Sequence, residues 1–467
     1  MASIRIFRHS LRLHTLLLAT GDFLILAGAT YAGAYIRFRG DVEAILASVG
    51  WLLPRAVLYA AVVIICLIAI GFYQQRLSSG CFAYALRVLI GFFFAGILLA
   101  SIFYLFPELY VGRGVLLIAM AMSMSGIVVF RVVLGAAGME SVLKRRILVL
   151  GTGRKANSIT ALSNQGDHGA FHIVGFVPVA GTSDIVEPGR ILRLDQRLAD
   201  YASRNQIHEI VVALDDRRNN FPMNDLLECR MRGIPVIDEL SFFERETGKV
   251  RLDLVQPSWI IFSDCFQSHF WRRCSKRLFD VVVSLLVLSV AWPIMMLTAL
   301  AIFIESGGKG PILYRQVRVG EHDQPFTLLK FRSMGVDAEK DGKARWAKKN
   351  DVRITRVGRV IRKIRFDELP QIVNILRGEM SIVGPRPERP EFVDKFGESI
   401  TYYHERHRIK PGLSGWAQLR YPYGSTEQDV VEKLQYDLYY VKNHSLFLDL
   451  SILILTVETV CFGKGAH

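Results

Sequence analysis

Four long apolar runs dominate the first third of the chain, and no other feature of the sequence constrains the fold as strongly. They cover Leu16–Tyr35, Ala56–Phe72, Val88–Phe106 and Tyr110–Phe130. Each approaches the roughly 20 residues that a helix needs to cross a bilayer. A mean hydropathy of +0.28 also argues against a wholly soluble chain and against a disordered one. We therefore predict a four-helix transmembrane bundle over residues 1–138.

Positive charges beside these runs predict the orientation of the bundle, because cytoplasmic segments are enriched in Lys and Arg. The flanking cations are Arg5, Arg8 and Arg12 before the first run and Arg131, Lys144, Arg145 and Arg146 after the fourth. We therefore expect the N-terminus and all that follows Arg131 to face the cytoplasm. The first run lacks a small-residue cleavage signal, so we expect it to be retained. Asp22 lies inside it, and we interpret Asp22 as a helix-packing carboxylate rather than as part of an ion path.

Alternating strand and helix patterns follow from Arg145 onward and predict a Rossmann-like α/β cytoplasmic domain over residues 139–270. The segment Arg146–Leu150 has the pattern of a buried strand, and Gly151-Thr-Gly153-Arg-Lys-Ala156 fits a G-x-G-x-x-A turn into a helix. No acidic residue ends the next predicted strand, Phe171–Val179, where a ribose partner would stand. We therefore favour a structural or regulatory module over a nicotinamide-cofactor site.

A further apolar run, Val281–Ile304, follows a basic segment and is closed by Glu305. A fifth crossing would place the rest of the chain outside the cell. Pro293 lies near the middle of the run, where its missing N–H and its ring bend or break a helix. We therefore predict a helix that breaks at Pro293, a re-entrant membrane hairpin over residues 278–305 with both ends in the cytoplasm.

The C-terminal third is polar, basic and dense in short motifs. They are Lys330-Phe-Arg332-Ser-Met334, Arg362-Lys-Ile-Arg365-Phe-Asp367-Glu368-Leu-Pro370-Gln371, Gly384-Pro-Arg386-Pro387 and Lys410-Pro-Gly-Leu-Ser-Gly-Trp-Ala-Gln418. The whole chain carries 57 Lys+Arg against 43 Asp+Glu, a net charge of +14. Beside apolar runs, this surplus favours anionic lipid or phosphate-bearing substrates, and we expect no nucleic-acid partner.

Asp367 and Glu368 precede Pro370, which marks a helix start. Adjacent acids on a helix diverge by about a hundred degrees, so one can act as nucleophile while the other holds a divalent cation. The nearby cations that can receive a diphosphate are Lys330, Arg332, Arg362, Arg365 and Arg386. The alternative is that the acid pair only caps a helix on a charged surface.

With these motifs, residues from about Lys276 to the end resemble the bacterial sugar transferase family, the monotopic polyprenyl-phosphate phosphoglycosyl transferases. The whole chain is similar to the large members that start exopolysaccharide, capsule or O-antigen units. The resemblance implies an α-rich catalytic domain with a re-entrant membrane helix over residues 271–467, at the bacterial inner membrane. It implies transfer of a hexose-1-phosphate from a UDP-sugar, with UDP-glucose or UDP-galactose favoured, to undecaprenyl phosphate with release of UMP.

The resemblance also implies roles for individual residues. Asp367 is the expected nucleophile, which forms an aspartyl-phosphosugar, and Glu368 is a Mg²⁺ ligand beside it. Arg362 is expected to contact phosphate and Arg386 to hold the nucleotide, while Lys330 and Arg332 line the same anionic site. The four spans and the Rossmann-like insert also offer surface for a homodimer.

Two other functions stay open from the sequence. One is a membrane-tethered nucleotide-sugar oxidoreductase that uses the Gly151-Thr-Gly153 turn, and the missing ribose carboxylate counts against it. The other is a non-enzymatic scaffold or transport component in which the four membrane spans are the functional part. His404, His407 and His444 show no metal-ligand spacing, so we expect structural roles for them.

Overall fold

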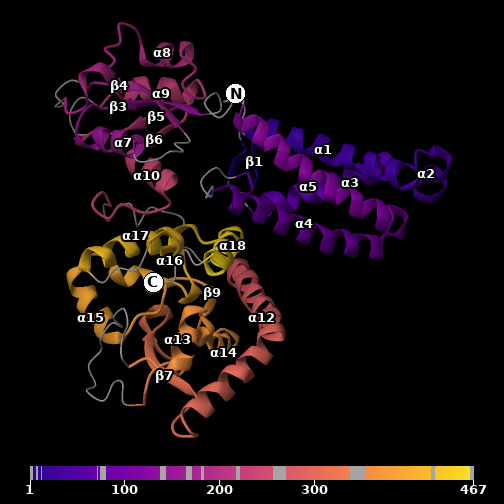
Figure 1. Cartoon of the computed structure of the whole chain (residues 1–467). Coiled ribbons are helices and arrows are strands. Elements are labelled where there is room, and N and C mark those ends of the chain that lie inside the picture. Colours follow the sequence, from indigo (N-terminus) through magenta and orange to yellow (C-terminus); the bar gives the residue numbers. More distant parts are fainter. Residues whose placement is uncertain are drawn as a thin grey trace. The chain divides into compact units, whose positions relative to one another are not determined.

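The computed structural model describes residues 4–6, 9–11, 13–70, 72–73, 80–136, 144–164, 171–179, 184–216, 221–255, 270–336, 353–421 and 426–462. The chain divides into two compact units, Met1–Glu246 and Thr247–His467 (Figure 1). The finer division at residues 138 and 270 stays a prediction. Of the cations used to predict the orientation, Arg8 and Arg12 lie outside the described residues.

All four apolar runs of the first third form helices, as predicted. They are α1 (Leu13–Arg37), α3 (Leu52–Ala69), α4 (Gly80–Leu105) and α5 (Arg113–Ala136). Helices α1 and α4 each contact both α3 and α5, which makes a four-helix bundle around one apolar core. Short elements flank these helices: β1 (Ile4–Ile6), β2 (His9–Leu11), α2 (Val42–Val49) and η2 (Pro107–Leu109).

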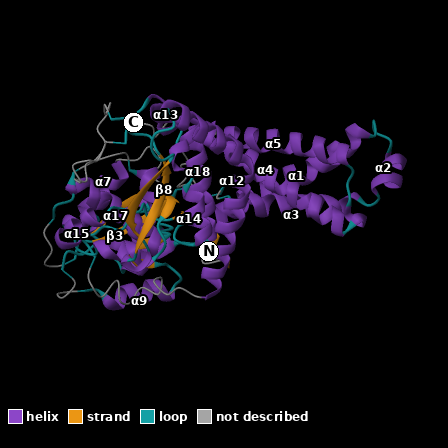
Figure 2. Cartoon of the chain, turned by 90° about the horizontal axis from the view of Figure 1, so that it is seen from below, coloured by secondary structure: helices purple, strands orange, loops and turns teal. Residues whose placement is uncertain are grey.

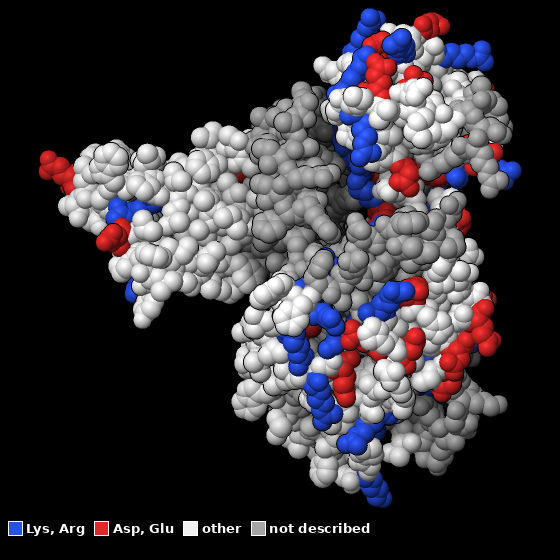
Figure 3. Space-filling model, turned by 180° about the vertical axis from the view of Figure 1, so that it is seen from behind, with Lys and Arg blue, Asp and Glu red and all other residues white. Residues whose placement is uncertain are grey.

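The bundle has the surface of a membrane-embedded body. Figure 3 shows its described surface almost without charged side chains, except near the end that carries α2. Among the described residues, three helices are long and apolar enough to cross a membrane: Arg87–Leu105, Arg113–Leu134 and Phe270–Glu305. The bent pair Val42–Val49 and Leu52–Ile68 would be a fourth if it forms one span. The chain is therefore a membrane protein, and the number of its crossings stays a prediction.

Asp22 has the packing role that we expected. Its side chain is fully buried, and its Oδ2 accepts a hydrogen bond from the Tyr73 hydroxyl (2.8 Å) and an ion pair from Arg131 (2.6 Å). Arg131 also stacks on the Phe72 ring. The carboxylate therefore joins α1 to α5, and its two contacts explain its place inside an apolar run.

The rest of the first unit is a parallel four-stranded sheet in the order β4-β3-β5-β6. The strands are β3 (Arg145–Leu150), β4 (Phe171–Val177), β5 (Glu209–Val212) and β6 (Val236–Asp238). Helices α7 (Arg154–Asn164), α8 (Leu198–Arg204), α9 (Met223–Met231) and α10 (Glu239–Thr247) and the turn η3 (Pro188–Arg190) connect them.

Side chains alternate between the two faces of this sheet, which gives it one apolar core on each side. Leu148 and Leu150 of β3 pack with α8 and α9, whereas Ile147 and Val149 of the same strand pack with α7 and α10. Strands β3 and β4 follow the predicted segments Arg146–Leu150 and Phe171–Val179 closely, and the layered α/β arrangement confirms the Rossmann-like domain.

Helices predominate in the second unit (Figure 2). After α12 (Phe270–Glu305), strands β7 (Leu313–Val319) and β8 (Pro325–Phe331) form an antiparallel hairpin with η5 (Glu321–Asp323) at its turn. Strands β9 (Ser381–Val383) and β10 (Gly412–Ser414) pair in parallel. The helices are α13 (Arg356–Lys363), η6 (Phe366–Glu368), α14 (Gln371–Arg377), α15 (Pro390–Ser399), η7 (Tyr403–Arg408), α16 (Trp416–Arg420), α17 (Glu427–Asn443) and α18 (Leu446–Phe462).

The predicted break at Pro293 is wrong, because α12 is one helix of 36 residues that runs through this proline. It also begins before residue 278, the predicted start of the hairpin. A proline inside a helix removes one hydrogen bond and crowds the preceding turn, and a helix can accommodate this by bending. Figure 1 shows that α12 changes direction along its length.

Both ends of α12 are fixed to the second unit. Near its start, Arg277 donates from Nη1 to the Ile375 carbonyl and from Nη2 to the Leu376 carbonyl, each at 2.6 Å. At its end, Glu305 accepts from the backbone N–H of Arg356 at 2.7 Å, the first residue of α13. Between these contacts the helix exposes apolar side chains, among them Leu286, Val290, Met296 and Leu297.

Lys276 and Asp280 extend the first of these attachments into a buried polar network. The Asp280 carboxylate accepts from the Ser381 hydroxyl (2.9 Å) and the Ile382 N–H (3.0 Å), which are both in β9. Lys276 pairs with Asp449 of α18 at 2.8 Å. Since charges are costly to bury unless paired, this network fixes the position of the membrane helix on the domain.

Candidate functional site

The acid pair lies on a short turn between two helices. Helix α13 ends at Lys363, and Arg365 then takes a left-handed backbone conformation with φ of 61°. This reverses the chain into the 3-10 turn η6, which carries Asp367 and Glu368, and α14 follows after Pro370. The prediction that the pair precedes a helix start is confirmed.

Glu368 is the centre of a convergent set of cations. Its Oε1 accepts a hydrogen bond from Arg386 Nη2 at 2.9 Å and lies 3.3 Å from Lys330 Nζ. Arg365 Nη1 is 3.8 Å from the same oxygen. Glu368 is 9% exposed. Although burial favours the protonated form, Arg386, Lys330 and Arg365 hold the pKa of Glu368 far below its ordinary value.

Asp367 has a different environment from its neighbour. Burial, and then the charge of Glu368, raise its pKa above the ordinary aspartate value, while Lys330, Arg362 and Arg365 oppose the shift. Within the described parts of the chain, its carboxylate has no hydrogen bond or ion pair. Two adjacent carboxylates thus have pKa values pushed in opposite directions, a pattern typical of catalytic sites.

The cations come from separate parts of the unit. Lys330 is near the end of β8, and burial lowers its pKa. Arg386 lies between two prolines, and its own carbonyl accepts from Arg406 Nη2 at 3.0 Å. The sequence analysis missed Arg318 of β7, which donates to the Pro387 carbonyl at 3.0 Å and so supports the Arg386 loop. The alternation of polar side chains along β7 was the available signal.

The other two predicted cations, Arg362 and Arg332, differ in their relation to the acid pair. Arg362 acts on Asp367 through its charge. Arg332 is buried and donates from Nη1 to the Lys309 carbonyl at 3.3 Å. The described part of the chain gives Arg332 no contact with the acid pair, so the structure supports it as a packing residue beside the site. The structure thus brings together Lys330, Arg365 and Arg386 around Glu368, and the charges of Lys330, Arg362 and Arg365 act on Asp367.

The donor set of this site fits Mg²⁺. This ion takes hard oxygen ligands, commonly one or two carboxylates together with substrate phosphates and water. Lys330, Arg365 and Arg386 all contact Glu368 through Oε1, and Asp367 adds a second carboxylate on the neighbouring position. A carboxylate pair between cations is suited to a diphosphate bound with a divalent ion.

The glycine-rich turn of the first unit is occupied by a protein carboxylate. Asp215, which follows β5, accepts from the N–H of Arg154 (2.9 Å) and of Lys155 (3.0 Å) at the start of α7. A Cβ at Gly153 would lie 2.1 Å from Asp215 Oδ2. These N–H groups are the ones that a dinucleotide phosphate would use. The arrangement therefore argues against the oxidoreductase reading.

Two family profiles match the chain. The profile described as bacterial sugar transferase matches residues 271–463, and one described as CoA-binding domain matches residues 68–220. The first range contains all of α12 after its first residue, the acid pair and every predicted cation of the site.

Curated relatives show the same similarity. The chain is 40% identical over 242 residues to the UDP-N-acetylgalactosamine-undecaprenyl-phosphate N-acetylgalactosaminephosphotransferase of Aeromonas hydrophila, across 52% of this chain and 56% of that protein. It is 32% identical over 332 residues to the undecaprenyl-phosphate glucose phosphotransferase of Komagataeibacter xylinus, across 69% and 60%. An uncharacterized sugar transferase of Bacillus subtilis, EpsL, is 40% identical over 190 residues, 41% of this chain and 89% of EpsL. The matches to the first two relatives thus cover little more than half of each relative's own length.

Proposed function

Because the chain belongs to the bacterial sugar transferase family, we propose that it transfers a hexose-1-phosphate from a UDP-sugar to undecaprenyl phosphate and releases UMP. The observation that carries the proposal is the convergence of Lys330, Arg386 and Arg365 on Glu368, directly beside Asp367. Such a set matches the charge of a diphosphate and supplies a nucleophile next to it.

The first displacement uses Asp367. Its carboxylate oxygen attacks the phosphorus that carries the sugar, and the bond from that phosphorus to the bridging oxygen breaks. UMP leaves with the bonding electrons, and the sugar phosphate is held as an acyl phosphate on Asp367. Arg386 and Lys330 stabilise the charge that develops on the phosphoryl oxygens.

The second displacement regenerates the enzyme. A phosphate oxygen of undecaprenyl phosphate attacks the same phosphorus, and the bond from phosphorus to the Asp367 oxygen breaks. The product is undecaprenyl-diphosphate-sugar, and Asp367 returns as a carboxylate. Neither displacement requires a proton transfer to or from the acid.

Glu368, together with Asp367, is the proposed holder of Mg²⁺. When bound, the ion would neutralise charge on the diphosphate. Glu368 suits this task because its depressed pKa keeps it ionised at neutral pH.

The membrane helix explains how a lipid phosphate reaches this site. Both ends of α12 contact the same unit, through Arg277 at the start and Glu305 at the end, which supports a helix that enters and leaves the bilayer on one side. If straight, the 23 residues from Asp280 to Ile302 would extend about 33 Å, enough to cross the hydrocarbon core. We propose that the bent helix is re-entrant and that the catalytic unit faces the cytoplasm at the inner membrane.

The sugar remains a choice among hexoses. The relatives are named for N-acetylgalactosamine, glucose and galactose. We propose UDP-glucose or UDP-galactose first and UDP-N-acetylgalactosamine next, with the product starting a surface polysaccharide unit.

The nucleotide released in a defined assay tests this function. Protein in lipid nanodiscs is incubated with a UDP-sugar, Mg²⁺ and undecaprenyl phosphate, and the released nucleotide is identified by mass spectrometry. We expect UMP from the parent protein and less than about 1% of that rate from Asp367→Asn. Asp394→Asn, an exposed acid on α15, is the matched control and should keep the parent rate. Release of UDP, or full activity of Asp367→Asn, contradicts the proposal.

A further inference from the structure

Three possible metal ligands meet on the second unit, away from the contacts of the acid pair. They are Asp323 in the turn of the β7–β8 hairpin and His404 and His407 on η7, and one ligand atom from each lies within 4.8 Å of the others. Both imidazoles direct Nδ1 at the same oxygen: Asp323 Oδ1 is 3.1 Å from His404 Nδ1 and 2.6 Å from His407 Nδ1.

The helix type explains why the two histidines act together. A 3-10 helix has three residues per turn, so side chains three positions apart are aligned on one face. His404 and His407 therefore point to the same side of η7, and their ring centroids are 6.1 Å apart. Their carboxylate partner is 81 residues before His404, which is why sequence spacing does not reveal the cluster.

The surroundings fix the rings with Nδ1 facing the carboxylate. His404 Nε2 is packed against Gly397, where a Cβ would lie only 2.3 Å from that nitrogen. His407 is 6% exposed, and its Nε2 has no hydrogen-bond partner within the described ranges. Among the described residues, the hydrogen bonds of these two rings are thus directed only at Asp323.

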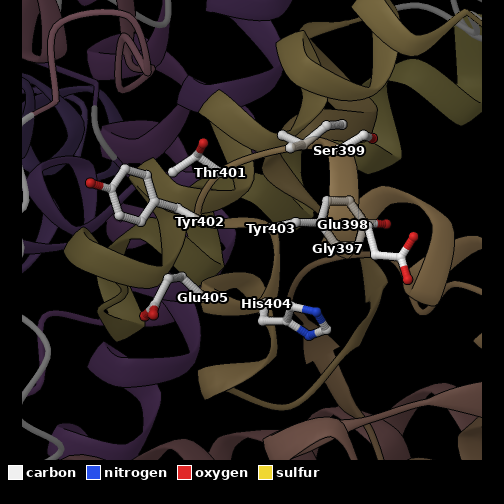
Figure 4. Close-up of a pocket in the computed structure, with 9 residues that line it drawn as sticks. Gly397, Glu398, Ser399, Thr401, Tyr402, Tyr403, His404 and Glu405 are labelled. Atoms are coloured by element: carbon white, nitrogen blue, oxygen red, sulfur yellow. The ribbon is translucent and has the colours of Figure 1, made fainter.

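The cluster is open to solution on one side. The side chains of His404 and Asp323 are about half exposed, at 52% and 49%. Figure 4 shows His404 at a pocket lined by residues 397–405, with its ring directed away from the Glu405 carboxylate. An ion and a water molecule can therefore reach the cluster from the solvent.

We propose that Asp323, His404 and His407 bind a structural zinc ion whose fourth ligand is water. Two imidazole nitrogens and one carboxylate oxygen form a donor set that Zn²⁺ takes. With ligand atoms about 2.0–2.1 Å from a tetrahedral ion, neighbouring ligand atoms are about 3.3 Å apart. The distance from Asp323 Oδ1 to His404 Nδ1 is close to that value, and the one to His407 Nδ1 needs a small opening. This site stands independently of the proposed transferase function.

The ion would join the turn of the β7–β8 hairpin to η7, and both segments support the Arg386 loop. Asp323 lies in the hairpin turn, and η7 also carries Arg406, which donates to the Arg386 carbonyl. Zinc binding would thus hold η7 against the hairpin and keep the Arg386 loop in place. The effect on catalysis is indirect, through the position of that loop.

Metal analysis of the full-length protein tests the site. The chain is produced with a tag that contains no histidine, stripped with a chelator, reloaded with Zn²⁺ or Co²⁺ alone, and desalted. We expect one zinc per chain and, for Co²⁺, the visible absorption bands of a tetrahedral site. Asp323→Asn and His404→Ala should each weaken binding by at least about tenfold.

A neighbouring imidazole provides the control. His322 is exposed and also has a left-handed backbone, which Asn tolerates, so His322→Asn should keep one zinc per chain. Asp323→Asn distinguishes the ion from a hydrogen-bonded triad, because the Asn oxygen can still accept from an imidazole while its metal affinity is lost. Substoichiometric zinc in the parent protein, or unchanged binding in Asp323→Asn, overturns the proposal. UMP release by the parent protein, measured separately, reports on the transferase function alone.

Discussion

The buried ion pair between Arg406 and Asp437 allows us to predict how much stability the second unit loses when one partner is removed. The two side chains are 7% and 3% exposed, and Arg406 Nη2 lies 2.7 Å from Asp437 Oδ2. Removing one partner of such a pair leaves an uncompensated buried charge and costs about 3–5 kcal/mol. We therefore expect Asp437→Asn to destabilise the second unit by at least about 3 kcal/mol.

Hydrogen exchange measured by mass spectrometry can report this loss for each segment of the full chain. A loss of about 3 kcal/mol corresponds to at least about a hundredfold faster exchange of protected amides in η7 and α17. Burial raises the pKa of Asp437 to about 6, so the carboxylate is ionised at pH 8 and mostly protonated at pH 5. Because this pKa is raised above the ordinary aspartate value, the folded parent protein binds a proton as the pH falls through about 6 and gains stability, which Asn cannot do. The penalty of Asp437→Asn should therefore be larger at pH 5 than at pH 8, once exchange rates are corrected for pH.

Two controls separate burial from pairing. Arg232 and Asp200 form a pair at the same 2.7 Å, but their side chains are 38% and 40% exposed, so Asp200→Asn should change exchange in α8 and α9 little. The double variant Arg406→Gln with Asp437→Asn removes both buried charges and should recover part of the loss. Equal effects of Asp437→Asn and Asp200→Asn, or no change on lowering the pH, would refute the reasoning.

Two further predictions concern the proposed reaction. Because burial and Glu368 raise the pKa of Asp367, the rate of UMP release should fall on acidification at a pH above the ordinary aspartate value. Lys330 opposes the shift, so Lys330→Met should move that midpoint to higher pH; an unchanged or lower midpoint contradicts this. A chelator should abolish UMP release, and added Mg²⁺ should restore it. Glu368→Gln should raise the Mg²⁺ concentration needed for half-maximal rate at least about tenfold. An equal Mg²⁺ requirement in Glu368→Gln would exclude Glu368 as a ligand.

The architecture could be predicted from the sequence wherever the signal is local. The apolar runs indicated α1, α3, α4 and α5, and strand patterns indicated β3 and β4 of the parallel sheet. The predicted break at Pro293 was wrong because a local rule considers only the backbone hydrogen bond that the proline removes. The ends of α12 are held by Arg277 and Glu305 through contacts 98 and 51 residues away in the chain, and these lie beyond any local rule.

In the candidate site too, features that depend on neighbouring residues could be predicted, and features that depend on distant contacts could not. The adjacency of Asp367 and Glu368 is visible in the sequence, and the density of cations around it indicated Lys330, Arg365 and Arg386. The environments of the two acids depend on contacts across 38 and 18 residues, from Lys330 and Arg386 to Glu368. Asp215 is 61 residues from Arg154, whose N–H it occupies, so the filled glycine-rich turn could not be foreseen either.

The most direct measurement for the central claim is detection of the covalent intermediate on Asp367. The protein is mixed with a UDP-sugar and Mg²⁺ but without undecaprenyl phosphate, quenched in acid, digested and examined by mass spectrometry. We predict a peptide containing Asp367 that gains the mass of a hexose phosphate and loses it when undecaprenyl phosphate is added before the quench. An unmodified peptide in a preparation that still releases UMP only when the lipid is present would contradict the two-displacement mechanism.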